Sequence, residues 1–149
     1  MSFKRILVAT DFSPCSAKAL EIAGSLAKVF DAKVILCHAL EAPEEHTLLG
    51  GSLKPLVNFP EEQRKAETAL RAEAKKASLE DRLESVEVLM HQPGEEVTRL
   101  AGERDCDLIV VGTHGRTGFR HFVMGSVTER ICRMSPVPVL VVPSKDKPA

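Results

Sequence analysis

Residues 107–126 read DLIVVGTHGRTGFRHFVMGS and join an apolar run to a glycine-rich, basic loop. The run Leu108–Val111 is continuously apolar, which is typical of a strand with both faces covered, as in parallel sheets. The segment from Gly112 to Ser126 holds four glycines, two arginines and two histidines. Ligands of parallel sheets bind beyond the carboxyl ends of the strands. The loop is therefore either a flexible turn or a cradle for an anion, and the spacing alone leaves both interpretations open.

Similar apolar runs recur along the chain, and helical periodicity lies between them. Buried strands are expected at residues 6–9, 34–37, 108–111 and 137–142, and a half-alternating edge strand at 86–90. Helices are expected at residues 14–30, 60–81, 94–103 and 127–134. This alternation of strands and helices predicts an α/β fold, with an open parallel sheet and helices on both faces.

The 149 residues suit one domain, and the composition, with 44% apolar and 28% charged residues, is typical of globular proteins. Within it, residues 41–59 carry no clear element and predict a flexible loop, a lid or a partner-binding segment. Residues 144–149 form a short polar tail. We therefore expect residues 1–149 to form a single domain.

Charge and cysteine usage limit the partners and the compartment. A net charge of -1 argues against broad binding to nucleic acid or to anionic membranes. No apolar run reaches the ~20 residues that a membrane span needs, and no signal-peptide cleavage site follows the N-terminal run. The four cysteines form no C-x-x-C pair, which predicts reduced thiols, three of them in the core, in a cytoplasmic protein.

The glycine-rich loop has features of an anion site. Glycines can take positive φ and expose backbone N–H groups without obstruction by side chains. Ser126 and Glu129 match an S-x-x-E capping box at the start of the last helix. The N–H groups of Val127 and Thr128 and the helix dipole would then face an anion, with hydroxyls and Arg116 or Arg120 adding donors. A P-loop is excluded because no Gly-Lys-Ser/Thr follows at the required spacing.

The glycine spacing also carries a family resemblance. Gly112-x2-Gly115-x9-Gly125-Ser126 matches the G-2x-G-9x-G-(S/T) signature of ATP-binding universal stress proteins. ILVATDFSP (6–14), KVILCHAL (33–40) and GSVTERICRMSPVPVLVV (125–142) also resemble that family. The resemblance covers essentially the whole chain and is weakest over residues 41–84. It implies a doubly wound, Rossmann-like, five-stranded parallel sheet in the order 3-2-1-4-5.

The resemblance further implies the residues of a nucleotide site. Thr10, Asp11 and Ala9 would lie beside ribose and adenine, and Ala39 would meet adenine through its backbone. Positions along the ribose and phosphates match Val111, Gly112, Gly115 and Arg116. The phosphate-binding helix start matches Gly125, Ser126, Val127 and Thr128. The expected ligand is ATP, or AMP or cyclic AMP, with Mg²⁺ or Mn²⁺ on the phosphates.

The expected function is adenine-nucleotide binding by a stress-response or signalling module. The resemblance implies a homodimer joined through the apolar run Val137–Val142, and a further protein partner would read the nucleotide state. Two alternatives stay open: slow ATP hydrolysis, although no general base is evident, and a nucleotide-free protein-interaction module. The sequence shows no catalytic triad and no carboxylate pair.

Overall fold

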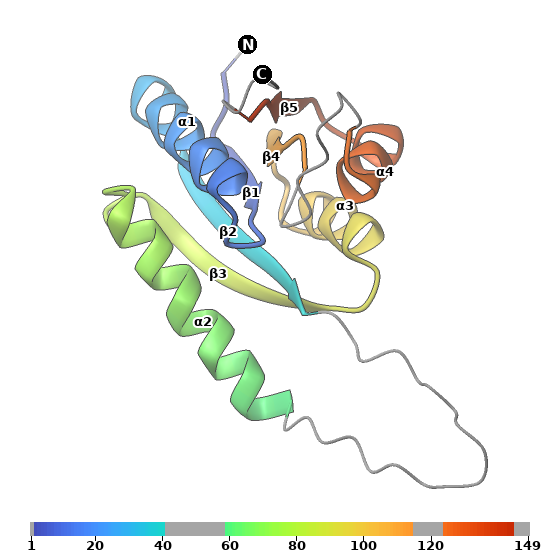
Figure 1. Ribbon diagram of the computed structural model, residues 1–149. Coiled ribbons are helices and arrows are strands. Elements are labelled where there is room, and N and C mark those ends of the chain that lie inside the picture. Colours follow the sequence, from blue (N-terminus) through green and yellow to red (C-terminus); the bar gives the residue numbers. More distant parts are fainter. Residues whose placement is uncertain (1, 41–58, 115–123, 145–149) are drawn as a thin grey trace, which may run out of the picture.

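The computed structural model describes residues 2–40, 59–114 and 124–144, which form a central sheet with helices on both sides (Figure 1). In chain order the elements are β1 (Arg5–Ala9), α1 (Pro14–Phe30), β2 (Lys33–Leu40), α2 (Phe59–Lys76), β3 (Leu83–Met90), α3 (Pro93–Glu103), β4 (Leu108–Gly112), α4 (Ser126–Met134) and β5 (Val139–Val142). The predicted order of strands and helices is confirmed.

The sheet has five parallel strands in the order β3-β2-β1-β4-β5. α1 and α2 pack on one face, and α3 and α4 cover the other (Figure 1). The doubly wound α/β fold with strand order 3-2-1-4-5 is therefore confirmed. The chain moves outward from β1 in one direction, then crosses to β4 on its other side. This switch point lies between β1 and β4.

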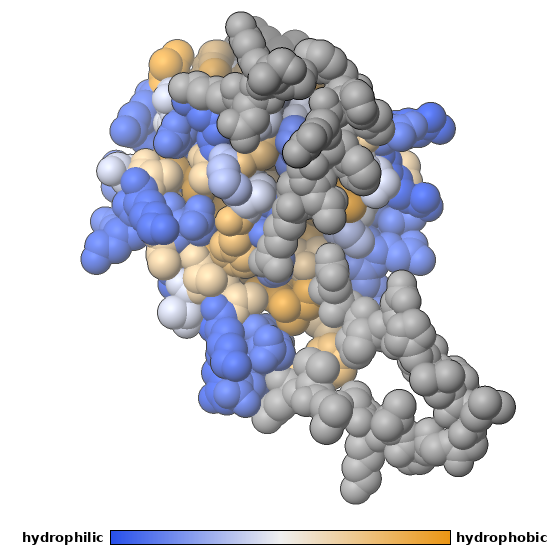
Figure 2. Space-filling view, viewed as in Figure 1, coloured by the Kyte–Doolittle hydropathy of each residue, from blue (hydrophilic) through white to orange (hydrophobic). Residues whose placement is uncertain are grey.

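Alternation along each strand divides the core into two layers. In β1, Ile6 and Val8 pack toward α1 and α2, whereas Leu7 between them packs toward α3 and α4. All three side chains are fully buried. Because both faces are covered, the strand reads as an unbroken apolar run, which is why the sequence pattern identified it. Figure 2 shows hydrophilic side chains on the flanking helices and apolar ones between them.

The first helix begins and ends at the residues that its sequence predicts. Ser13 caps it by accepting a hydrogen bond from the Ser16 N–H at 3.2 Å, and Pro14 occupies its first turn. At the other end Asp31 adopts a left-handed conformation with φ 56° and closes the helix.

Several element boundaries differ from the prediction, and β2 runs on to Leu40 rather than ending at residue 37. α2 ends at Lys76 rather than residue 81, because Ser78 turns left-handed at φ 55°. The Leu79 N–H then bonds to the Ala74 carbonyl at 2.9 Å, closing a Schellman motif. β3 begins at Leu83 rather than residue 86, with charged Glu84 on the sheet edge, where its side chain reaches water. β5 begins at residue 139 because Ser135 Oγ bonds both backbone groups of Val137.

Some expectations fall outside the described residues. They include nearly all of the predicted loop at 41–59, apart from Phe59 in α2, and the tail beyond Ser144. Within the described part of the chain, no helix is long and apolar enough to cross a membrane.

Candidate functional site

The predicted site residues that the structure describes lie at the carboxyl edge of the sheet, around its switch point. Ala9 ends β1, while Val111 and Gly112 end the neighbouring strand β4. Ala39 lies near the end of β2, two residues beyond Cys37, which is the register partner of Ala9. In open α/β sheets, ligands bind in the crevice at this point.

Three of these residues form a small apolar floor on the face covered by α3 and α4. Val111 is buried in that layer of the core, and Ala9 and Ala39 pack against it while remaining partly exposed. Their side chains are short and apolar. Short apolar side chains of this kind suit contact with a flat ring.

Thr10 and Asp11 are held in the turn between β1 and α1. The Thr10 hydroxyl accepts a hydrogen bond from the Phe12 N–H at 3.0 Å and shares one with Ser16 Oγ at 2.9 Å. Asp11 Oδ1 accepts from the Ser13 N–H at 3.0 Å and from Ser16 Oγ at 2.9 Å. Thr10 is buried. Both side chains thus have a structural role in shaping the turn, whatever ligand contact Asp11 makes.

The same turn contains a strained residue that sequence reasoning missed. Phe12 has φ 64°, a left-handed conformation that costs a non-glycine residue about 1–2 kcal/mol. Its ring lies 4.6 Å from the His38 ring, centroid to centroid. His38 Nδ1 lies 2.8 Å from the Thr10 carbonyl oxygen, which gives the histidine a hydrogen-bond partner at the strand end. No glycine or asparagine marked this position in the sequence.

Gly112 is required by packing rather than by positive φ. Its φ lies outside the left-handed region, and a Cβ there would lie 2.7 Å from Cys15 Sγ and 3.3 Å from the Cys15 backbone. Gly112 therefore does not use the positive φ that glycine allows. Its missing side chain lets α1 approach the end of β4.

The prediction of a capping box formed by Ser126 and Glu129 is wrong. The N-cap of α4 is Gly125, and no side chain from the described residues caps this helix. Gly125 instead donates its N–H to the Thr113 carbonyl at 2.7 Å, and a Cβ on it would lie 3.3 Å from that oxygen. The first bond within the helix is made by the Glu129 N–H to Gly125. The three N–H groups before Glu129 therefore point out of the helix start, as the anion-site prediction requires.

The Thr128 hydroxyl faces the protein instead of a ligand. It donates to the Gly112 carbonyl oxygen at 2.7 Å, and the residue is 6% exposed. This bond fixes the first turn of α4 against the end of β4. Only the backbone N–H of Thr128, and not its hydroxyl, fits the predicted role. Ser126, by contrast, is exposed.

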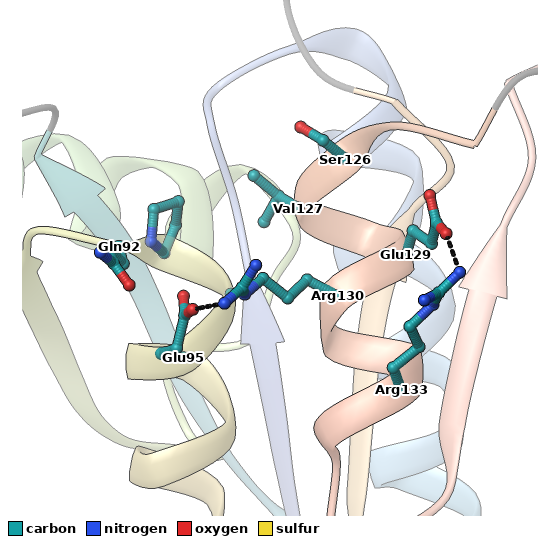
Figure 3. Close-up of a pocket in the computed structure, with 9 residues that line it drawn as sticks. Gln92, Glu95, Ser126, Val127, Glu129, Arg130 and Arg133 are labelled. Atoms are coloured by element: carbon teal, nitrogen blue, oxygen red, sulfur yellow. Dashed lines mark hydrogen bonds and ion pairs between the residues drawn. The ribbon is translucent and has the colours of Figure 1, made fainter.

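A cavity of about 530 Å³ lies between the first turns of α3 and α4 (Figure 3). Both helices begin at the carboxyl edge of the sheet, so their positive dipole ends lie at the same side of the molecule. The lining residues are Gln92, Pro93, Gly94 and Glu95 around the start of α3, and Ser126, Val127, Glu129, Arg130 and Arg133 on α4. The sequence did not predict that α3 contributes to this cavity, because no motif indicates that its first turn faces α4.

Two ion pairs order the charged side chains of this cavity. Arg130 pairs with Glu95 across the gap between the helices, and Arg133 pairs with Glu129 at 2.6 Å along α4 (Figure 3). Both arginine side chains are more than half exposed, at 59% and 76%. Exposed pairs of this kind contribute about 0–1 kcal/mol and exchange readily for a stronger anion.

Among the described residues, little supports chemistry by a reactive thiol or a metal ion held by protein side chains alone. No group of three His, Cys, Asp or Glu side chains gathers there to hold a metal ion. Burial raises the pKa of the Cys106 thiol to about 11 and that of Cys37 well above its usual range. Both thiols stay protonated at neutral pH and behave as small core side chains, as does buried Cys15.

Gly115 and Arg116, the remaining predicted residues, lie outside the described residues. The structure thus brings together Ala9, Ala39, Val111, Gly112 and the start of α4, with Thr10 and Asp11 in the adjoining turn. Apolar strand ends beside a helix start that no described side chain caps define a Rossmann-like α/β protein, a class that binds ligands at its switch point.

Comparison with known proteins identifies the family. The universal stress protein family model matches residues 2–143, and the chain therefore belongs to the universal stress protein family. Universal stress protein MJ0577 of Methanocaldococcus jannaschii is 31% identical over 157 residues, covering 97% of each chain. Universal stress protein YxiE of Bacillus subtilis is 32% identical, covering 94% of this chain and 99% of its own.

Solved structures agree with this assignment. The structure of MJ0577 matches with a TM-score of 0.71 and 29% identity, covering 98% of this chain and 99% of the other. A universal stress protein in complex with cAMP matches with a TM-score of 0.68 and 25% identity, covering 95% and 98%.

Proposed function

We propose that this universal stress protein binds ATP or another adenine nucleotide at the switch point of its sheet. The observation that carries the proposal is the apolar floor of Ala9, Ala39 and Val111 beside the start of α4, which no side chain from the described residues caps. A planar base fits the floor, and an anion fits the helix start. The cAMP complex of a relative supports the same ligand class.

The phosphates would be held mainly by backbone groups. The N–H groups of Ser126, Val127 and Thr128 precede the first bond within α4 and carry the positive end of its dipole. By family resemblance, Gly115 and Arg116 extend this cradle. Each exposed helix-end interaction contributes about 0.3–1 kcal/mol, whereas micromolar binding needs about 8 kcal/mol. Several such contacts must therefore act together with the floor.

A divalent cation would bind through the nucleotide. The described residues offer no cluster of three metal-ligating side chains, so Mg²⁺ or Mn²⁺ would take its ligands from phosphate oxygens and water. The cation would neutralise phosphate charge there. Hydrolysis is the weaker alternative, because the two carboxylates of the cavity, Glu95 and Glu129, are both paired with arginines.

The biological role that follows is a nucleotide-dependent stress-response or signalling module. A nucleotide that orders the site changes the surface offered to a partner, provided that the partner distinguishes the two states. A homodimer through residues 137–142 is part of this proposal. It is supported by the position of β5 at the edge of the sheet. Buried, protonated thiols suit a reducing, cytoplasmic setting.

Calorimetric titration with ATP, AMP and cyclic AMP tests the proposal. We expect heat with at least one nucleotide, and mass spectrometry of freshly purified protein should detect the same class of molecule. Ala39→Phe should weaken binding at least about tenfold by filling the floor, whereas Ala39→Val is the small apolar control and should retain it. No heat and no thermal shift with any of the three nucleotides would favour a nucleotide-free interaction module.

A further inference from the structure

The cavity between α3 and α4 extends the proposed nucleotide site in one direction. At one end it is lined by Ser126 and Val127, the start of α4 where phosphates would bind. Arg130 lines it further along and lies on the same side of α4, since residues four apart share a helix face. Its Cα is about one turn, or about 5.4 Å, beyond the helix start. A chain of phosphates that begins at Ser126 therefore leads toward Arg130.

Packing against α3 sets the direction of the Arg130 side chain. A Cβ at Gly94 would lie 3.0 Å from Cβ, Cγ and Cδ of Arg130, so the glycine leaves room for the aliphatic stem. The stem thus runs from α4 across the first turn of α3, and Figure 3 shows the guanidinium between the two helices. Gly94 itself is buried.

The guanidinium is held there by an exchangeable partner. Its ion pair with Glu95 joins side chains that are 59% and 25% exposed. Glu95 lies in the first turn of α3, where the helix dipole stabilises its charge even without the arginine. A phosphate carries more charge than a carboxylate and accepts the guanidinium in two parallel bonds. A phosphate that reaches the cavity can therefore replace Glu95.

We propose that Arg130 recognises the terminal phosphates of the bound nucleotide, and that Glu95 holds the arginine in place until those phosphates displace it. The inference rests on the proposed nucleotide site and states which nucleotide that site prefers. The Arg130–Glu95 ion pair makes the site favour ATP over AMP, because only a polyphosphate spans the distance from the start of α4 to Arg130. AMP uses the floor and the helix start alone.

Titration of purified variants with ATP and AMP in the presence of Mg²⁺ tests this inference. Arg130→Ala should lower ATP affinity by about ten- to a hundredfold, the range of a charge-assisted hydrogen bond, and leave AMP affinity unchanged. Glu95→Gln should raise the ATP-to-AMP affinity ratio, since it releases the guanidinium. Arg130→Gln, of similar length, repeats the test if the alanine variant unfolds.

Matched controls exist on α3. Arg99→Ala removes the same charge from an arginine paired with Glu96 and Glu103, and Glu96→Gln neutralises the carboxylate beside Glu95. Neither residue lines the cavity, and neither change should alter the ratio. The inference is overturned if Arg130→Ala weakens ATP and AMP equally, or if Arg99→Ala alters the ratio as strongly. Absence of AMP and ATP binding in the unmodified protein would instead reject the nucleotide site itself.

Discussion

Gly112 shows at the residue scale how packing, rather than backbone freedom, selects glycine. Gly112→Ala would place a Cβ 2.7 Å from Cys15 Sγ, and we expect it to lower the free energy of unfolding by about 1–3 kcal/mol in urea titrations. Cys15→Ala in the same chain should restore part of this loss, because it removes the sulfur. Gly102→Ala is the control, since nothing lies within 4 Å of its Cβ position. An unchanged midpoint for Gly112→Ala would contradict the packing role.

Ser78 is a second residue at which the backbone conformation determines how a change to glycine affects stability. Its φ of 55° closes α2, so Ser78→Gly should raise the free energy of unfolding by about 0.5–1 kcal/mol. Ser25→Gly, the same change inside α1, should lower it by about 0.5 kcal/mol, since glycine is the poorer helix former. Chemical denaturation measures both. Equal effects of the two changes would show that Ser78 is not under strain.

At the scale of elements, α4 is fixed to the sheet by the Thr128 hydroxyl. Thr128→Val keeps the shape of the side chain but removes the 2.7 Å bond to the Gly112 carbonyl, so we expect a loss of about 1–3 kcal/mol. Thr128→Ser should lose less. Hydrogen exchange should also become faster at the start of α4.

The control for this change is Thr98→Val in α3. Thr98 is equally buried at 6%, but its hydroxyl donates to carbonyls of its own helix, those of Gly94 and Glu95. Removing the Thr98 hydroxyl therefore breaks no hydrogen bond between different elements. A smaller effect at Thr98 than at Thr128 is therefore expected. The reverse order would reject the assigned anchor.

The sequence predicts elements well where local chemistry determines them. Continuous apolar runs identify strands that are covered on both faces, and Ser13-Pro14 marks the start of α1. The end of α2 was missed because it depends on Ser78 adopting an unfavourable φ so that Leu79 packs into the core. The prediction of a capping box was wrong because the Gly125 N–H bonds to the Thr113 carbonyl, a contact that only the folded chain creates.

The same limit applies to the site. The family resemblance located the floor and the start of α4, and the floor residues lie at or near the ends of apolar strands that the sequence pattern identifies. The wall of the cavity formed by Gln92–Glu95 comes from another helix, and no spacing along the chain encodes its approach to Arg130. Long-range packing, allowed by Gly94, determines that part of the site.

At the scale of the whole molecule, the two sheet edges differ in chemistry. β3 carries Glu84 and Glu87, whose ion pairs with Arg5 and Arg104 keep charge along that edge. β5 contains only apolar residues, and Leu140 on it is 36% exposed. Charged side chains discourage pairing between edges, whereas apolar edges invite it. A second copy would therefore join at β5.

The proposed dimer gives the last prediction. The Pro138 carbonyl accepts a bond from Ile109 in β4, and the Val142 carbonyl accepts one from Thr113 just after β4. The backbone groups of Val139 and Val141 therefore point away from β4 and are available to a partner strand. Leu140→Lys should shift the mass measured by sedimentation from two chains toward one, with at least a tenfold weaker association. Val141→Pro removes an outward N–H and should act in the same direction. Ser85→Lys on β3 should leave the mass unchanged. A two-chain mass that survives both β5 changes and is lost with Ser85→Lys would place the interface at the other edge.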